Sequence, residues 1–211
     1  MNIYVGIDPS INSTGVCIQY YSNEGVKMQN DKFFIVKGGK LTKKEKQAEL
    51  DNIDVFSYIV YDKIETKTSD DNHEFEHIKT TNFIKIVNGV FEELVKAING
   101  APEPVLNIWI CQEGISYGST LKTKSVFDLA GLNYMLRMKF MTCGHDSIKY
   151  IIATPGEMKK FATGAGNANK ELIINVFQSI YPELNLPKID DVADAYFMAS
   201  YARHLFEKEN F

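Results

Sequence analysis

The sequence contains little arginine, few cysteines and no long apolar run. Of its 23 basic residues, only Arg137 and Arg203 are arginines. Arginine is the side chain that most often reads guanine through two hydrogen bonds, so this composition disfavours a sequence-reading DNA-binding factor. The three cysteines lack the paired spacing of zinc sites, and Cys17 and Cys111 fall inside apolar segments, so we expect reduced core residues. No apolar run approaches the length of a membrane span.

What the sequence does contain is typical of one globular domain. The 211 residues are 45% hydrophobic and 24% charged, with a formal net charge of −4. This is enough chain to bury a core, and the acidic balance argues against a protein that coats nucleic acid while permitting a local contact with it. Residues 1–3 lead into an apolar segment without a basic leader, so we expect a cytoplasmic protein with no membrane association.

The first apolar segment carries one carboxylate to its end. Ile3, Val5 and Ile7 alternate with other residues as in a buried strand, and Pro9 ends it because proline has no N–H to donate. Asp8 therefore lies where the strand stops. Asp-Pro-Ser is also ordinary turn chemistry, so a structural role for Asp8 is the alternative.

The remaining periodicities predict an α/β fold. They favour a mixed five-stranded sheet flanked by helices, in the order three strands, helix, strand, helix, strand, helices. The strand before Glu113 brings a second carboxylate to a strand end. The strands are expected at 3–8, 14–20, 32–36, 105–111 and 148–153. The helices are expected at 83–98, at 126–136, from Pro155 to a break at 164–166, at 168–181 and from about 190.

Residues 37–78 have the least regular pattern, and we interpret them as an insertion in a single domain spanning 1–211. They open with a run of lysines that indicates either a solvated helix face or a surface that meets DNA. These lysines are Lys37, Lys40, Lys43, Lys44 and Lys46.

Two further carboxylates open the last predicted helix. Asp191 and Asp194 are three residues apart and so share one helix face, and the small Ala193 and Ala195 allow close packing. The alternative is that the aspartates only cap the helix.

Taken together, the acids suggest a metal site. If Asp8, Glu113, Asp191 and Asp194 converge, their mutual repulsion calls for cations among them. Oxygen ligands suit Mg²⁺ or Mn²⁺, and two such ions about 4 Å apart support phosphodiester hydrolysis by water.

Several motifs occur in an order that resembles the RuvC-type Holliday-junction resolvases of the ribonuclease H-like superfamily. The resemblance spans most of the chain. The motifs are Gly-Ile-Asp-Pro-Ser at 6–10 with Thr14-Gly15, Glu113, Ala-Thr-Pro-Gly-Glu-Met-Lys at 153–159, Gly-Ala-Gly-Asn-Ala-Asn-Lys at 164–170, and Asp-Val-Ala-Asp-Ala at 191–195.

This resemblance implies a homodimeric, Mg²⁺-dependent endonuclease that makes paired nicks in branched DNA such as four-way junctions, leaving 5′-phosphate ends. The four acids named above match the catalytic, metal-binding acids, and the helix at about 123–140 matches the dimerisation helix. The long separation of Asp8 from Glu113 suggests a phage or viral relative, acting in the host cytoplasm. The residues expected near DNA are Lys159, Lys170, Ser116, Tyr117 and Lys122, with Ser116 standing where the family often carries an aromatic residue.

Parts of the sequence also fit other functions. A non-catalytic accessory protein that binds branched DNA with the same fold is the main alternative. His-Glu-Phe-Glu-His at 73–77 fits a zinc-peptidase pattern, but its setting is polar and acidic. The loop at 164–170 lacks the Gly-Lys-Ser/Thr ending of a phosphate loop.

Overall fold

The computed structural model describes residues 1–61, 73–115 and 123–210. Six strands and six helices lie in these ranges. The strands are β1 (Asn2–Asp8), β2 (Ser13–Tyr21), β3 (Lys32–Gly38), β4 (Phe56–Tyr61), β5 (Asn107–Glu113) and β6 (Ile148–Ala153). The helices are α1 (Lys43–Asp51), α2 (His73–Asn99), α3 (Thr123–Met141), α4 (Pro155–Thr163), α5 (Lys170–Ile180) and α6 (Ile189–Asn210).

The described strands form one mixed sheet in the order β4-β3-β2-β1-β5-β6. The first three strands form an antiparallel meander, and the β3–β4, β1–β5 and β5–β6 pairs are parallel. Five strands therefore finish at the same end of the sheet, where β2 begins. We call this the carboxyl end of the sheet.

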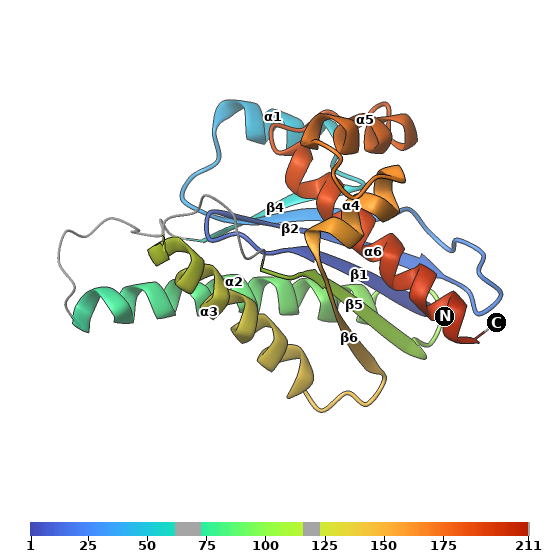
Figure 1. The fold of residues 1–211 in the computed structure, drawn as a ribbon, viewed down its shortest axis with the longest axis horizontal. Helices are drawn as coiled ribbons and strands as arrows, with labels where there is room; N and C mark the ends of the chain where they lie inside the picture. The colour runs from blue at the N-terminus through green and yellow to red at the C-terminus, as the bar shows by residue number, and fades with distance from the viewer. Residues whose placement is uncertain (62–72, 116–122, 211) are drawn as a thin grey trace.

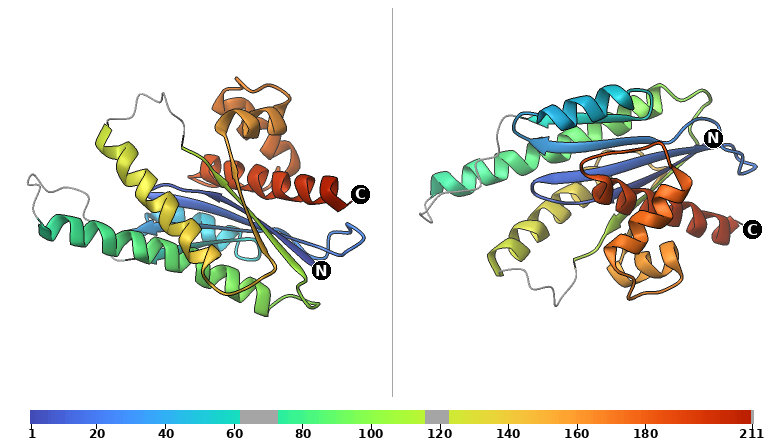
Figure 2. Two further views of the ribbon diagram at one scale, coloured as in Figure 1. Left: turned by 60° about the horizontal axis from the view of Figure 1, so that its bottom comes forward. Right: turned by 90° about the horizontal axis from the view of Figure 1, so that it is seen from above.

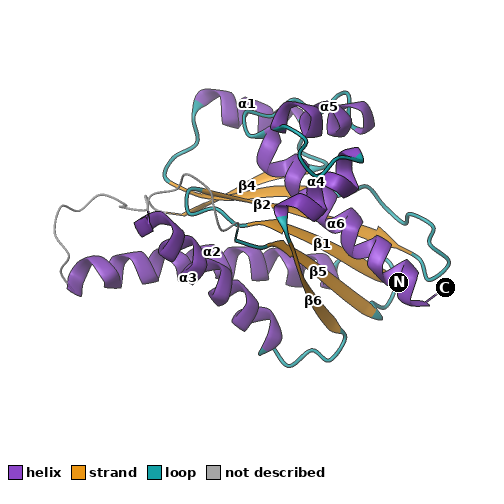
Figure 3. Ribbon diagram, viewed as in Figure 1, coloured by secondary structure: helices purple, strands orange, loops and turns teal. Residues whose placement is uncertain are grey.

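Helices cover both faces of the sheet (Figures 1 and 3). The views in Figure 2 place α2 and α3 on one face and α4, α5 and α6 on the other. Ile3, Val5 and Ile7 point into the core under α2 and α3, whereas Tyr4 belongs to the core under α6. This alternation is the one expected of a strand that is buried on both faces. Helix α1 adds Ala48 to the core on the α6 side.

The fold class is confirmed, but the strand number is corrected from five to six. The additional strand, β4, lies within the segment 37–78 that we interpreted as an insertion. Phe56 and Tyr58 point inward while Ser57 and Val60 are exposed, so the strand is half-buried and its apolar signal is short. Helix α1 provides the crossover that a parallel β3–β4 pair requires. That 37–78 is an insertion stays a prediction.

The helix predicted at 83–98 begins earlier in the structure, at His73. The sequence His-Glu-Phe-Glu-His thus lies in the first turns of α2, although the side chains of 73–75 are outside the described part. Over the described ranges, no helix combines the length and the apolar composition that crossing a membrane requires.

Candidate active site

Two of the predicted acids end neighbouring parallel strands. Asp8 is the last residue of β1 and Glu113 the last of β5. The register pairs Ile7 with Gln112, so the two carboxylates follow one another directly at the carboxyl end of the sheet. Adjacent strands lie about 4.8 Å apart. The strand ends alone therefore bring Asp8 and Glu113 together.

Two glycines let α6 approach β1 and β2 closely. A Cβ atom on Gly6 would lie 1.8 Å from the carbonyl oxygen of Ala195, and one on Gly15 would lie 2.3 Å from that of Asp191. Neither site has room for a side chain. Ala193 and Ala195 are fully buried in this contact. The first turns of α6 are thereby fixed over the end of β1, which confirms the close packing expected from these small residues.

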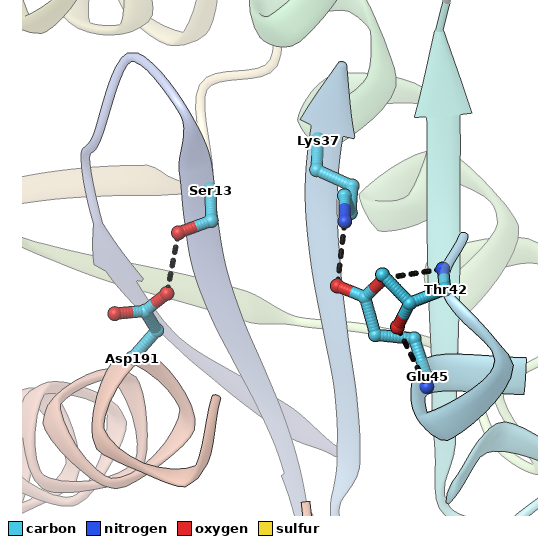
Figure 4. A network of polar contacts seen from close by, with 5 residues as sticks. All are labelled: Ser13, Lys37, Thr42, Glu45 and Asp191. Atoms are coloured by element: carbon cyan, nitrogen blue, oxygen red, sulfur yellow. Dashed lines mark hydrogen bonds and ion pairs between the residues drawn. The ribbon is translucent and has the colours of Figure 1, made fainter. Parts of the chain in front are cut away.

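Asp191 is held by a side chain from β2 (Figure 4). The hydroxyl of Ser13, the first residue of β2, donates to Oδ2 of Asp191 at 2.6 Å. The helix begins at Ile189, so Asp191 is its third residue, and the capping interpretation does not describe it. The neighbouring Asp190 instead forms an ion pair with the amino group of Lys170 at 2.5 Å.

The carboxylates raise one another's pKa. Burial is the largest cause for Asp8, whose pKa lies well above its ordinary value, and Glu113, Asp194 and Asp191 add to the rise. Burial and the charge of Asp194 raise the pKa of Glu113 to about 7. Burial, opposed by Lys170, raises the pKa of Asp194 to about 6. The pKa of Asp191 is also raised, mainly by burial and against the hydrogen bond from Ser13. All four predicted acids therefore belong to one electrostatic cluster.

A small cavity of about 140 Å³ opens beside this cluster. Glu113 and Asp194 line it together with Lys159 of α4 and Lys170 of α5. Both lysines lower the pKa values of Glu113 and Asp194. The structure thus brings together two acids and two of the five predicted DNA-contacting residues. The other three, Ser116, Tyr117 and Lys122, lie outside the described residues.

Two contacts of the site were not predicted from the sequence. The hydrogen bond from Ser13 and the ion pair between Asp190 and Lys170 both join segments more than 15 residues apart. The position of Ser13, immediately before the Thr14-Gly15 motif, was the one available signal.

The donor set of the cluster fits hard divalent cations. Asp8, Glu113, Asp191 and Asp194 offer carboxylate oxygens, without histidine or thiolate, which suits Mg²⁺ or Mn²⁺. Within the described ranges, no three or more His, Cys, Asp or Glu side chains already stand in an arrangement that could hold an ion. Carboxylates that repel one another draw closer when a cation lies between them.

No family model and no curated protein matches the sequence. Among solved structures, Thermus thermophilus RuvC superposes with a TM-score of 0.51 at 18% identity, covering 98% of this chain and 95% of that one. The chain has a RuvC-type fold. RuvC from the same organism in complex with a Holliday junction substrate gives a TM-score of 0.51 at 12% identity, over 99% and 96% of the two chains.

The structure of the yeast mitochondrial Holliday junction resolvase Ydc2 is also similar to this chain. Its TM-score is 0.50 at 16% identity, with 98% of this chain and 81% of that chain covered. At such identities the similarity establishes the architecture alone, and the chemistry has to be argued from the residues of the site.

Proposed function

We propose that this protein is a divalent-metal-dependent endonuclease that nicks branched DNA and resolves four-way junctions. The observation that carries the proposal is the cluster of four carboxylates, delivered by β1, β5 and α6, at one end of a RuvC-type sheet. A cluster of buried and half-buried acids that raise one another's pKa values is costly for a fold to maintain. Cations bound between the carboxylates would offset this repulsion, so the cluster suits a metal-binding site.

Each acid has a place in this proposal. Asp8 and Asp191 hold the metals, Glu113 supports or bridges them, and Asp194 completes the cage. When bound, a pair of Mg²⁺ ions, or Mn²⁺ in their place, activates water and stabilises the leaving oxygen. The hydrogen bond from Ser13 keeps one oxygen of Asp191 occupied and so leaves the other oriented for a ligand.

The lysines beside the acids suit a phosphate substrate. Lys159 and Lys170 share a cavity with Glu113 and Asp194, so a phosphodiester placed against the acids would meet positive charge on its other side. Lysine neutralises phosphate without reading a base. This favours recognition of backbone shape, and the products we propose are nicks with 5′-phosphate and 3′-hydroxyl ends.

Helix α3 supports the proposal of a homodimer. Leu132 and Leu136 on its inner face are fully buried, and its outer face is also apolar. The outer residues are spaced by seven, four and three positions, which places them on one side of a helix. They are Phe127, Tyr134, Met138 and Met141, with exposed fractions of 71%, 62%, 62% and 73%. A second copy of the chain would cover this stripe and place two active sites on one junction.

The test is cleavage of synthetic DNA by the purified protein, with and without Mg²⁺. A four-way junction, a linear duplex and a single strand are compared, and Asp8→Asn and Asp146→Asn serve as matched variants. Asp146 is exposed and precedes β6, away from the acids. We expect paired nicks in the junction, a loss of roughly 10³-fold or more for Asp8→Asn, and full activity for Asp146→Asn.

Other outcomes would change the assignment. Cleavage of flaps, forks and junctions alike would indicate a general nuclease for branched DNA. Metal-independent binding of junctions without cleavage would support the non-catalytic accessory protein. Full metal-dependent cleavage by Asp8→Asn would contradict the site itself.

A further inference from the structure

Four exposed lysines surround the start of α1. Lys40, Lys43, Lys44 and Lys46, which we call the α1 lysines, lie within seven residues of one another. None of them forms an ion pair with the described residues. Two lysines near the opposite end of the sheet are paired with acids, Lys96 with Glu93 and Lys149 with Glu209. The α1 lysines thus leave unneutralised positive charge near the carboxyl end of the sheet.

The sheet places Lys37, near the end of the strand that leads into α1, two strands away from Asp8. The register pairs Lys37, near the end of β3, with Ser13 at the start of β2, and Ser13 binds Asp191. Neighbouring strands lie about 4.8 Å apart, so Lys37 is only about 10 Å across the sheet from β1. Figure 4 shows Lys37 on the far side of Ser13 from Asp191.

The acids therefore have lysines on two sides. Lys159 and Lys170 line the cavity that contains Glu113, at the end of β5, and the α1 lysines lie beyond the end of β3. Helix α1 packs into the same core as α4, α5 and α6, which places all of these lysines on one face of the sheet. A continuous polyanion could contact both groups while it passes the acids.

A buried ion pair fixes α1 in this position. Glu45 is buried, and its carboxylate accepts from the amino group of Lys37 at 2.5 Å. The same carboxylate accepts from the backbone N–H of Thr42, whose hydroxyl accepts from the N–H of Glu45, so the two complete a capping box. The negative charge of Glu45 is paired with Lys37, so it does not neutralise the α1 lysines.

The position of the lysines does not serve the helix. Lys43 and Lys44 occupy the first turn of α1, where the positive end of the helix dipole disfavours cations. Only Glu45 and Ala48 of this helix are buried, so α1 adds little to the core. A local arrangement that opposes helix stability is expected at a functional surface. An anion bound at this turn would turn the unfavourable charges into favourable ones.

We propose that the α1 lysines bind the phosphate backbone of a double-stranded DNA arm that runs from the acids across β2 and β3. This inference rests on the proposed function and adds the path of one arm to it. Each lysine that meets a phosphate releases counterions, so the contact is independent of sequence and sensitive to salt. The position of the α1 lysines determines on which side of the protein one arm of the junction lies.

The experiment measures junction binding by the triple variant K40Q/K43Q/K44Q in the full-length chain, in an Asp8→Asn background that prevents cleavage. Glutamine preserves length and helix propensity while removing the charge. The matched control is K32Q/K96Q/K208Q, which removes three exposed lysines that lie away from the carboxyl end of the sheet. Affinity is measured by fluorescence anisotropy over a range of salt concentrations, and contacts by hydroxyl-radical footprinting.

We expect the α1 variant to bind the junction roughly ten- to a hundredfold more weakly. Its plot of log affinity against log salt should be shallower by about two to three, since each lost phosphate contact removes about 0.9. Protection along one arm should disappear, while protection at the cleaved phosphate remains. The melting temperature of the free variant should stay the same or rise, whereas a structural role for the lysines would lower it.

The inference is overturned if the α1 variant and the control have the same salt slope and footprint, or if the α1 variant loses affinity only because it melts earlier. Loss of binding by both variants to the same extent would show a nonspecific charge effect and would also overturn it. If the parent protein binds no junction at all, the proposed function fails first and this inference falls with it.

Discussion

The hydroxyl of Ser13 donates a hydrogen bond to Oδ2 of Asp191 at 2.6 Å. This contact joins the first residue of β2 to the first turn of α6, 178 residues later in the chain. It also lowers a pKa that burial raises. One hydroxyl thus both positions the carboxylate and opposes the rise in its pKa.

Replacing Ser13 with alanine should impair the site without unfolding it. The pKa of Asp191 should rise once its donor is lost, so the acidic limb of the pH–rate profile should move to higher pH. A hydrogen bond to a charged group makes the expected loss of cleavage near neutral pH roughly tenfold. Ser13→Thr, which keeps the hydroxyl, should restore the profile. An equal loss at every pH, or no rescue by threonine, would contradict this role.

The acid cluster should destabilise the metal-free protein above neutral pH. The pKa of Glu113 rises from 4.5 to about 7 on folding, so the folded state binds more protons than the unfolded state between these values. The free energy of unfolding therefore falls as the pH rises through this window, and the fall is complete above it. Glu113→Gln should raise the free energy of unfolding by about 1 to 3 kcal/mol at pH 8, and should have little effect near pH 4.

Thermal denaturation in the presence of a chelator would measure this effect. Glu103→Gln, at an exposed site before β5, is the control and should leave the curve unchanged at both pH values. Addition of Mg²⁺ should stabilise the parent protein more than Glu113→Gln, because a ligand of the folded state stabilises it by mass action. A variant that melts earlier than the parent at pH 8 would refute the prediction.

Gly15→Ala should disturb both stability and cleavage. The added methyl group would lie 2.3 Å from the backbone oxygen of Asp191, so α6 must shift away from β2. Overpacking of this kind costs about 1 to 3 kcal/mol, measurable by urea unfolding. Gly156→Ala is the matched control, because its Cβ would meet nothing within 4 Å. Equal behaviour of the two variants would show that the close approach of α6 is not required.

Charges on the outer face of α3 should prevent dimerisation. Phe127 and Met138 are mostly exposed, so F127E/M138E should remain folded but sediment as a monomer at concentrations where the parent is a dimer. V26E/L106E places the same charges at exposed apolar positions elsewhere and should remain a dimer. A parent protein that is itself monomeric in analytical ultracentrifugation would refute the proposed dimer.

The sequence was sufficient to predict what depends on local pattern. The alternation around Asp8 and the apolar strand before Glu113 predicted two acids at strand ends, and parallel pairing then placed them together. The small residues around Asp194 predicted a closely packed helix, which the structure confirms. These features follow from periodicity and residue size within a few positions of each acid.

What the sequence did not predict depends on distant partners. The β4 strand is stabilised by pairing with β3, and its own half-buried pattern is too short to identify it. Ser13 and Asp191 are brought together only by the packing of α6 on β2. Glu45 reads as an exposed residue in a lysine-rich segment, yet Lys37 and Thr42 make it a buried anchor.

The sixth strand also protects the sheet. Without β4, the long and apolar β3 would present its backbone N–H and C=O groups at an open edge, where another chain could pair with them. β4 takes that place with a strand of six residues instead of seven, in which Ser57 and Val60 are exposed. The same segment that carries the α1 lysines therefore guards the protein against edge-to-edge aggregation.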